Sequence, residues 1–88
     1  MPLDVQLVSP EKILFNGEAK MVVCRTVSGG EIAFLAGHVS FIGALGSHPV
    51  RIVPPSGPET VVDVDGGFVE VSNDKVTILS DAAELRSG

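Results

Sequence analysis

Apolar and polar residues alternate along short stretches of the chain. Leu3, Val5 and Leu7 alternate with Asp4 and Gln6, which is the period-two pattern of a strand with one buried face. The same alternation, together with short apolar runs, predicts further strands at residues 13–15, 21–24, 31–35, 41–45, 50–52, 60–64, 68–71 and 75–79. We therefore expect about nine short strands.

Glycine and proline interrupt the chain too often for long helices before residue 68, since it contains ten Gly and six Pro. Asn16-Gly17 lies between two apolar runs and predicts a hairpin turn, and Asn73-Asp74 predicts another. Pro54–Glu59 reads as an exposed loop between two strands. These signals predict an all-β fold, a small sandwich or flattened barrel of nine to ten short strands.

The C-terminal residues change in character. Asp81 stands three residues before Glu84, the spacing of a capping box that begins a helix. Only four residues follow Glu84, too few for a stable isolated helix. We therefore expect a β-sandwich over residues 1–80 and the truncated start of a C-terminal helix over 81–88, with at most a vestigial helical turn.

Size and charge narrow the function classes. A chain of 88 residues can bury one core. Its net charge of −5 repels phosphate backbones and anionic lipids, so nucleic acid is not an expected partner. Cys24 is the only cysteine, which favours a reducing compartment. The start of the chain lacks a signal-peptide pattern, and no apolar run is long enough to cross a bilayer. Membrane association is therefore expected only indirectly, through a partner.

Candidate catalytic and metal-binding residues are few. Cys24, His38 and His48 could ligate a metal or form a Cys–His pair, but their spacing matches no compact zinc signature. Cys24 lies in an apolar strand and reads as a small core residue. Asp63 and Asp65 fall on one face of a strand, which reads as a solvated outer face. We expect no catalytic residue and no metal site.

Two further motifs could suggest a cofactor. Gly29-Gly30 and Gly66-Gly67 lack the helix and the Lys-Ser/Thr pair of a phosphate loop, so they read as turns. Lys20, near the predicted hairpin, resembles the modified lysine of biotinyl or lipoyl carrier domains, although Ala19 stands where such sites carry Met. No cofactor is expected in the preferred interpretation. A carrier domain modified on Lys20 is the alternative, and an unrelated small β binding module is a third.

The order of motifs resembles the N-terminal domain of the ATP synthase epsilon subunit, called delta in mitochondria. The most recognisable stretch is Gly30-Glu31-Ile32-Ala33-Phe34-Leu35-Ala36-Gly37-His38. Residues 8–11, 14–17, 65–71 and 76–81 resemble the first and last strands of that family. Ala33 stands where the family usually has Gly, and Ala36 and Ser40 replace common Pro residues, which leaves the shape of this loop open.

The resemblance implies a non-catalytic rotor component. Such a subunit belongs to the central stalk, links the gamma subunit to the c-ring and couples proton flow to ATP synthesis, peripheral to the inner (cytoplasmic) face of a bacterial plasma membrane. The family commonly continues into two helices that inhibit ATP hydrolysis or sense ATP. Residues 81–88 are too few to form these helices, so we expect neither property of this chain. By the same resemblance, the expected c-ring contacts are Ser28, Gly29, Gly30, Glu31 and His38, and the expected gamma contacts are Ser9, Pro10, Ser40, Phe41 and Ile42.

Overall fold

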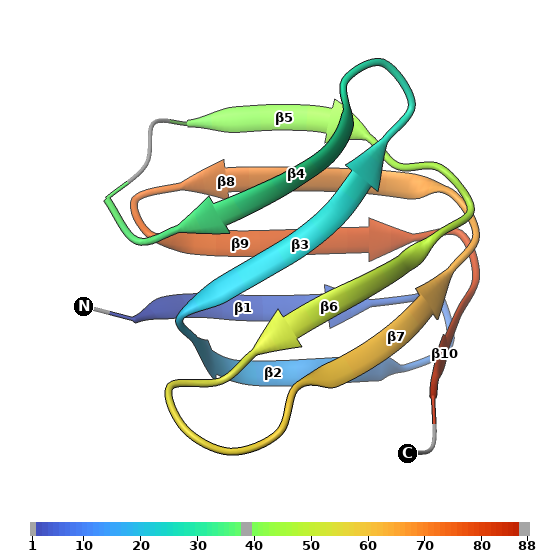
Figure 1. The fold of residues 1–88 in the computed structure, drawn as a ribbon. Helices are drawn as coiled ribbons and strands as arrows, with labels where there is room; N and C mark the ends of the chain where they lie inside the picture. Colours follow the sequence, from blue (N-terminus) through green and yellow to red (C-terminus); the bar gives the residue numbers. More distant parts are fainter. Residues whose placement is uncertain (1, 38–39, 87–88) are drawn as a thin grey trace.

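The computed structural model describes residues 2–37 and 40–86, which form two five-stranded sheets packed face to face (Figure 1). The strands are β1 Leu3–Val8, β2 Ile13–Ala19, β3 Met21–Thr26, β4 Gly30–Leu35, β5 Phe41–Ala44, β6 Pro49–Val53, β7 Thr60–Val64, β8 Gly67–Ser72, β9 Lys75–Ser80 and β10 Ala83–Leu85. Sheet A has the order β2-β1-β9-β8-β5, and sheet B has the order β10-β7-β6-β3-β4. The predicted all-β sandwich is confirmed.

The core lies between the two sheets and follows the alternation seen in the sequence. Leu3, Val5 and Leu7 of β1 are all buried, whereas Asp4 between them is exposed. Most of the other strands also contribute, and the buried cluster contains in addition Ala19, Val22, Cys24, Phe34, Leu45, Val50, Ile52, Val62, Val64, Val69, Val71, Val76 and Ile78. Full burial of one such Val or Leu side chain contributes about 1.5–3 kcal/mol. Burial of these side chains between the two sheets therefore stabilises the sandwich.

The turn predicted at Asn73-Asp74 is confirmed. These two residues join β8 to β9 and have φ values of 51° and 60°. A two-residue turn with positive φ at both positions is type I′, which matches the twist of the paired strands. Residues 54–59 also form the expected connection between β6 and β7, and residues 55–59 of this loop are exposed.

The hairpin predicted around Asn16-Gly17 is wrong. Both residues lie inside β2, opposite Gln6 and Val5 of β1, and neither has positive φ. The hairpin that does form joins β1 to β2, and its turn is closed by the Ser9 amide donating to the Lys12 carbonyl at 2.9 Å. The chain leaves sheet A after β2 and begins β3 in sheet B. The two apolar runs therefore belong to different sheets.

The C-terminal segment also differs from its prediction. Ala83–Leu85 forms strand β10, where the sequence predicted the start of a helix. β10 pairs antiparallel with the open side of β7, and the Asp65 amide donates to the Ala82 carbonyl at 2.8 Å while the Arg86 amide donates to the Val61 carbonyl at 3.0 Å. Pairing with β7 satisfies backbone groups that a single helical turn would leave unpaired.

Candidate interaction surfaces

The tip of the β3–β4 hairpin carries three of the residues expected to contact the c-ring. Ser28, Gly29 and Gly30 lie together there, and Ser28 and Gly29 are exposed. The Thr26 hydroxyl holds the loop, because it accepts the Gly29 amide at 2.9 Å and donates to the Gly30 carbonyl at 3.2 Å. Gly30 has φ +73°, a conformation that favours glycine. The tip is therefore exposed, and its conformation is defined by the Thr26 hydrogen bonds and by Gly30.

The tip is also attached to sheet A. The Val27 amide donates to the Ala44 carbonyl at 3.0 Å, and the Gly46 amide donates to the Arg25 carbonyl at 3.2 Å. The Val27 side chain, in contrast, is 68% exposed. The hairpin thus presents an apolar side chain and two glycines on a base held by backbone hydrogen bonds.

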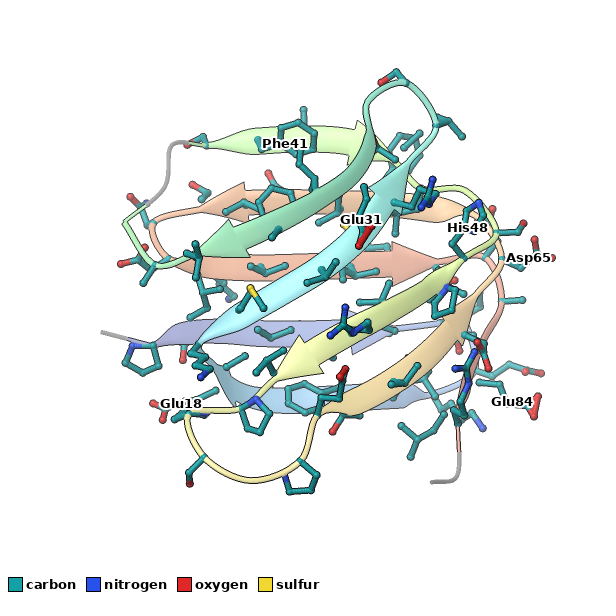
Figure 2. All side chains as sticks on the ribbon, viewed as in Figure 1. Glu18, Glu31, Phe41, His48, Asp65 and Glu84 are labelled. Carbon is teal, nitrogen blue, oxygen red and sulfur yellow. The ribbon has the colours of Figure 1, made fainter. Side chains whose placement is uncertain are left out.

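Glu31 follows the tip on the outer face of sheet B (Figure 2). It lies opposite Arg25 in the β3–β4 pair, with 3.9 Å between Arg25 Nη2 and Glu31 Oε1. The two side chains are 48% and 55% exposed. Glu31 therefore already has a partner within the chain, although a pair this exposed exchanges partners at little cost.

His38 falls outside the described residues. Gly37, the residue before it, lies beyond the end of β4 that is remote from the tip. A strand rises about 3.3 Å per residue, so the six residues of β4 separate its two ends by roughly 16 Å. Gly37 is thus well separated from the tip that carries Ser28, Gly29 and Gly30.

The residues expected to contact gamma lie at opposite ends of sheet A. β1 runs parallel to β9, and β8 is antiparallel to both β9 and β5, so β1 and β5 run in the same direction. Ser9 and Pro10 follow the end of β1, whereas Ser40 precedes the start of β5. The structure therefore does not bring Ser9 and Pro10 together with Ser40, Phe41 and Ile42.

An apolar row on the outer face of sheet A connects these two groups. Ile42, Phe68 and Leu79 are 70%, 57% and 55% exposed. Phe68 pairs with Leu79, Leu79 with Val8, and Val8 with Ile13, while Ile42 lies diagonally beside Phe68 on β5. The apolar row therefore takes one residue from each strand of the sheet and consists of Ile42, Phe68, Leu79, Val8 and Ile13. The row runs from β5 to β2, which is the strand that follows Ser9 and Pro10.

Sequence reasoning missed the apolar row, although a signal was present. Val69 and Ile78 point into the core, so their neighbours Phe68 and Leu79 take positions that alternation assigns to polar residues. Ile13 points outward because the β1–β2 pairing shifts register between Leu7 and Val8. Adjacent apolar residues in a strand that buries only one face indicate an exposed apolar side chain.

The outer face of sheet B has the opposite character. Arg51 Nε lies 2.7 Å from Glu59 Oε2, and Arg86 pairs with Asp63 through both Nε and Nη2. Asp65 accepts the hydroxyl of Ser47. The solvated role predicted for Asp63 and Asp65 agrees with their exposure and with these polar partners. With Arg25–Glu31, all three ion pairs found in the described residues thus lie on this face.

The remaining described candidates form no metal-binding cluster. Cys24 is buried in the core, and burial raises the pKa of its thiol to about 11. Within residues 2–37 and 40–86, no three His, Cys, Asp or Glu side chains are arranged to hold a metal ion. The same residues contain no helix that could span a membrane.

Lys20 does not occupy the position that a carrier domain requires. It stands between β2 and β3, where the chain passes from sheet A to sheet B, and its amide donates to the Val53 carbonyl at 2.8 Å. A carrier lysine belongs at a hairpin, and β2 and β3 do not form one. The alternative of a biotinyl or lipoyl carrier is therefore not supported.

Comparison with known proteins identifies the domain. Residues 2–86 match the family described as ATP synthase, Delta/Epsilon chain, beta-sandwich domain. The ATP synthase epsilon chain of Brevibacillus brevis is 41% identical over 83 residues, which cover 94% of this chain and 62% of that one. The epsilon chain of Frankia casuarinae is 41% identical over 85 residues, covering 97% of this chain and 99% of that one. The chain thus spans less than two thirds of the Brevibacillus relative and nearly all of the Frankia relative.

Solved structures share the fold. A chain of the Euglena gracilis mitochondrial ATP synthase (OSCP/F1/c-ring) superposes with a TM-score of 0.87 at 21% identity, over 96% of this chain and 53% of that one. A chain of the Tetrahymena thermophila mitochondrial ATP synthase (central stalk/c-ring) gives 0.78 at 16% identity, over 96% and 66%. At such low sequence identity the structural likeness shows only the fold. The family is shown by the match over residues 2–86. The chain belongs to the ATP synthase delta/epsilon family, whose β-sandwich domain it forms.

Proposed function

We propose that this chain is a non-catalytic rotor component of an ATP synthase, which links the gamma subunit to the c-ring and so couples proton flow to ATP synthesis. Its relatives are named ATP synthase epsilon chains, and its structural neighbours come from assemblies described by their c-ring and central stalk. The bacterial sources of the relatives favour the inner (cytoplasmic) face of a bacterial plasma membrane, which the chain reaches through the complex.

The fold suits a part that transmits force. The two sheets enclose one continuous apolar cluster, and close-packed protein interiors have low compressibility. Among the described residues, no group of His, Cys, Asp and Glu side chains is arranged to hold a metal ion, and the thiol of Cys24 is buried. What the domain offers is two kinds of exposed surface, the hairpin tip and the apolar row.

The apolar row is the single observation that carries the proposal. Solvent-exposed Ile, Phe and Leu side chains gathered on one face mark a surface that a partner covers. Three side chains of the row line a recess of about 320 Å³, together with Glu70 and Thr77. These three are Ile42, Phe68 and Leu79. We assign the gamma contact to this face. Ser40, Phe41 and Ile42 lie at its β5 edge, and Ser9 and Pro10 lie beside its other end.

We assign the c-ring contact to the hairpin tip. Ser28, Gly29 and Gly30 form it, with Glu31 beside them, and the c-ring contact predicted for His38 stays a separate prediction. An exposed pair between Glu31 and a basic group on the ring would add only about 0–1 kcal/mol. Shape fit of the tip must therefore supply most of this contact, and Val27 would be its apolar centre.

The two contacts can be separated by matched substitutions. Phe68→Asp and Ile42→Asp are expected to abolish co-purification with gamma, whereas Val27→Asp is expected to preserve it and to lower ATP-driven proton pumping by the reconstituted synthase. All three positions are more than half exposed, so thermal unfolding should stay close to that of the unmodified chain. If the unmodified chain failed to co-purify with gamma from membranes that yield a control subunit, the rotor function would be wrong.

A further inference from the structure

Three segments of the chain meet at Asp74, in the turn between β8 and β9. Its backbone carbonyl accepts the Asp4 amide at 2.9 Å, at the start of β1. Its carboxylate oxygen Oδ1 accepts the amide of Gly37 at 2.7 Å. Gly37 follows β4 of sheet B, so the side chain of Asp74 joins the edge of one sheet to a turn of the other. In Figure 1 the β8–β9 turn lies beside the segment that leaves β4.

The backbone alone does not explain an aspartate at this position. Asp74 has φ +60°, which Gly, Asn and Asp adopt most readily. Glycine would satisfy the type I′ turn, yet it would leave the Gly37 amide without this acceptor. A hydrogen bond from an amide to a carboxylate is stronger than one between neutral groups. The side chain at residue 74 therefore has a role beyond the turn.

That role follows from where β4 is held. At the tip end, the Val27 amide attaches the β3–β4 hairpin to Ala44 of sheet A. At the opposite end, Gly37 is attached to sheet A through Asp74. Between these points β4 pairs with β3, and its Phe34 side chain packs into the core between the sheets, a contact that is not directional. Pairing with β3 keeps β4 within sheet B, and the hydrogen bonds to sheet A near its two ends then fix its angle to that sheet.

We propose that Asp74 is a positioning residue that fixes the hairpin tip of sheet B relative to the apolar row of sheet A. This inference rests on the proposed function, in which the tip meets the ring and the row meets gamma. A rotor part attached on both sides transmits rotation only if the angle between its two contacts is held. Asp74 thus serves coupling without touching either partner.

Asp74→Asn and Asp74→Gly form a matched pair for the test. Asn keeps both the positive φ and a carbonyl acceptor, whereas Gly keeps only the φ. Hydrogen exchange of the Gly37 amide, followed by NMR, should accelerate about 5- to 10-fold in Asp74→Gly and stay near the original rate in Asp74→Asn.

The same variants are then placed in the reconstituted synthase. Asp74→Gly should bind gamma as the unmodified chain does, because the apolar row is intact, but should show a partial loss of ATP-driven proton pumping that Asp74→Asn restores. Unchanged Gly37 exchange in Asp74→Gly, or pumping equal in both variants, would overturn the positioning role and leave the rotor function standing. Failure of the unmodified chain to bind gamma would overturn both.

Discussion

A β-carbon at Gly67 would lie 2.1 Å from the carbonyl oxygen of Leu79 and 2.7 Å from the Cα of Ser80. Gly67 begins β8 and has φ +122°, a conformation that side chains rarely adopt. The neighbouring atoms belong to the backbone of β9, so they cannot rotate away. The β8–β9 pair therefore closes only with glycine at this position.

Gly67→Ala is expected to lower the free energy of unfolding by about 2–5 kcal/mol, since the steric clash adds to the cost of the left-handed backbone. Gly57→Ala is the matched control, because Gly57 has φ +96° and a β-carbon added there would meet no atom within 4 Å. It should lose only about 1–2 kcal/mol. Urea denaturation measures both, and equal losses would show that β9 moves aside.

The Cys24 thiol should be unreactive in the folded chain. Its pKa is raised from 9.0 to about 11 because burial disfavours the thiolate, which is the reactive form. A disulfide reagent at pH 8 should label it slowly until urea unfolds the chain. Rapid labelling of the folded chain would place Cys24 outside the core.

The same pKa shift predicts a pH dependence of stability. The folded pKa of Cys24 is higher than the unfolded one, so its contribution is complete below pH 9 and is lost as the pH rises from 9 towards about 11. In that interval the unfolded chain releases its thiol proton first. The Cys24→Ala variant should lack this part of the decline. Urea denaturation at pH 8, 9.5 and 10.5 compares the two chains.

Arg51 should hold the pKa of Glu59 below its ordinary value. The hydrogen bond from Arg51 is the main reason why the pKa of Glu59 lies below its ordinary value. Because the folded pKa is the lower one, the pair stabilises the fold above the ordinary glutamate pKa and loses this effect as the pH falls through the folded value. In Arg51→Gln, an NMR titration should show the pKa of Glu59 rising towards its ordinary value. Arg25→Gln is the control, and a pKa for Glu59 that is equal in all three chains would disprove the pairing.

The C-terminal strand can be tested directly. Ala83–Leu85 should show strand-type carbon chemical shifts, and the amides of Arg86 and Asp65 should exchange slowly, because they donate to carbonyls across the β7–β10 pair. The amide of Gly57, in the exposed loop, provides a fast-exchanging reference. Helical shifts over residues 83–85 would favour the capping-box interpretation instead.

Features set by neighbours in the sequence were predictable. The alternation in β1 located a strand, since successive side chains of a strand point to opposite faces. Asn73-Asp74 was correctly assigned to a turn because positive φ is a local preference of these residue types. The hairpin tip could be located for the same reason, since Gly29-Gly30 separates two strands.

Features that depend on a choice between distant partners were not predictable. The Asn16-Gly17 motif favours a turn, yet β1 pairs with this segment and keeps it extended. Residues 83–85 carry a helix signal, but the open side of β7 is a partner that the sequence does not display. In both cases backbone pairing with a remote strand outweighs a local preference.

By itself the sequence determined strands β1 to β9, the turn at Asn73-Asp74, a core of alternating apolar residues and the family. Only the tertiary structure decided which strands share a sheet, and with that the composition of the apolar row. Ile13 and Ile42 are 29 positions apart in the chain, and they join one apolar row because five strands pair in an order unlike their order in the sequence. Local patterns specify backbone conformation, whereas a surface is assembled by long-range pairing.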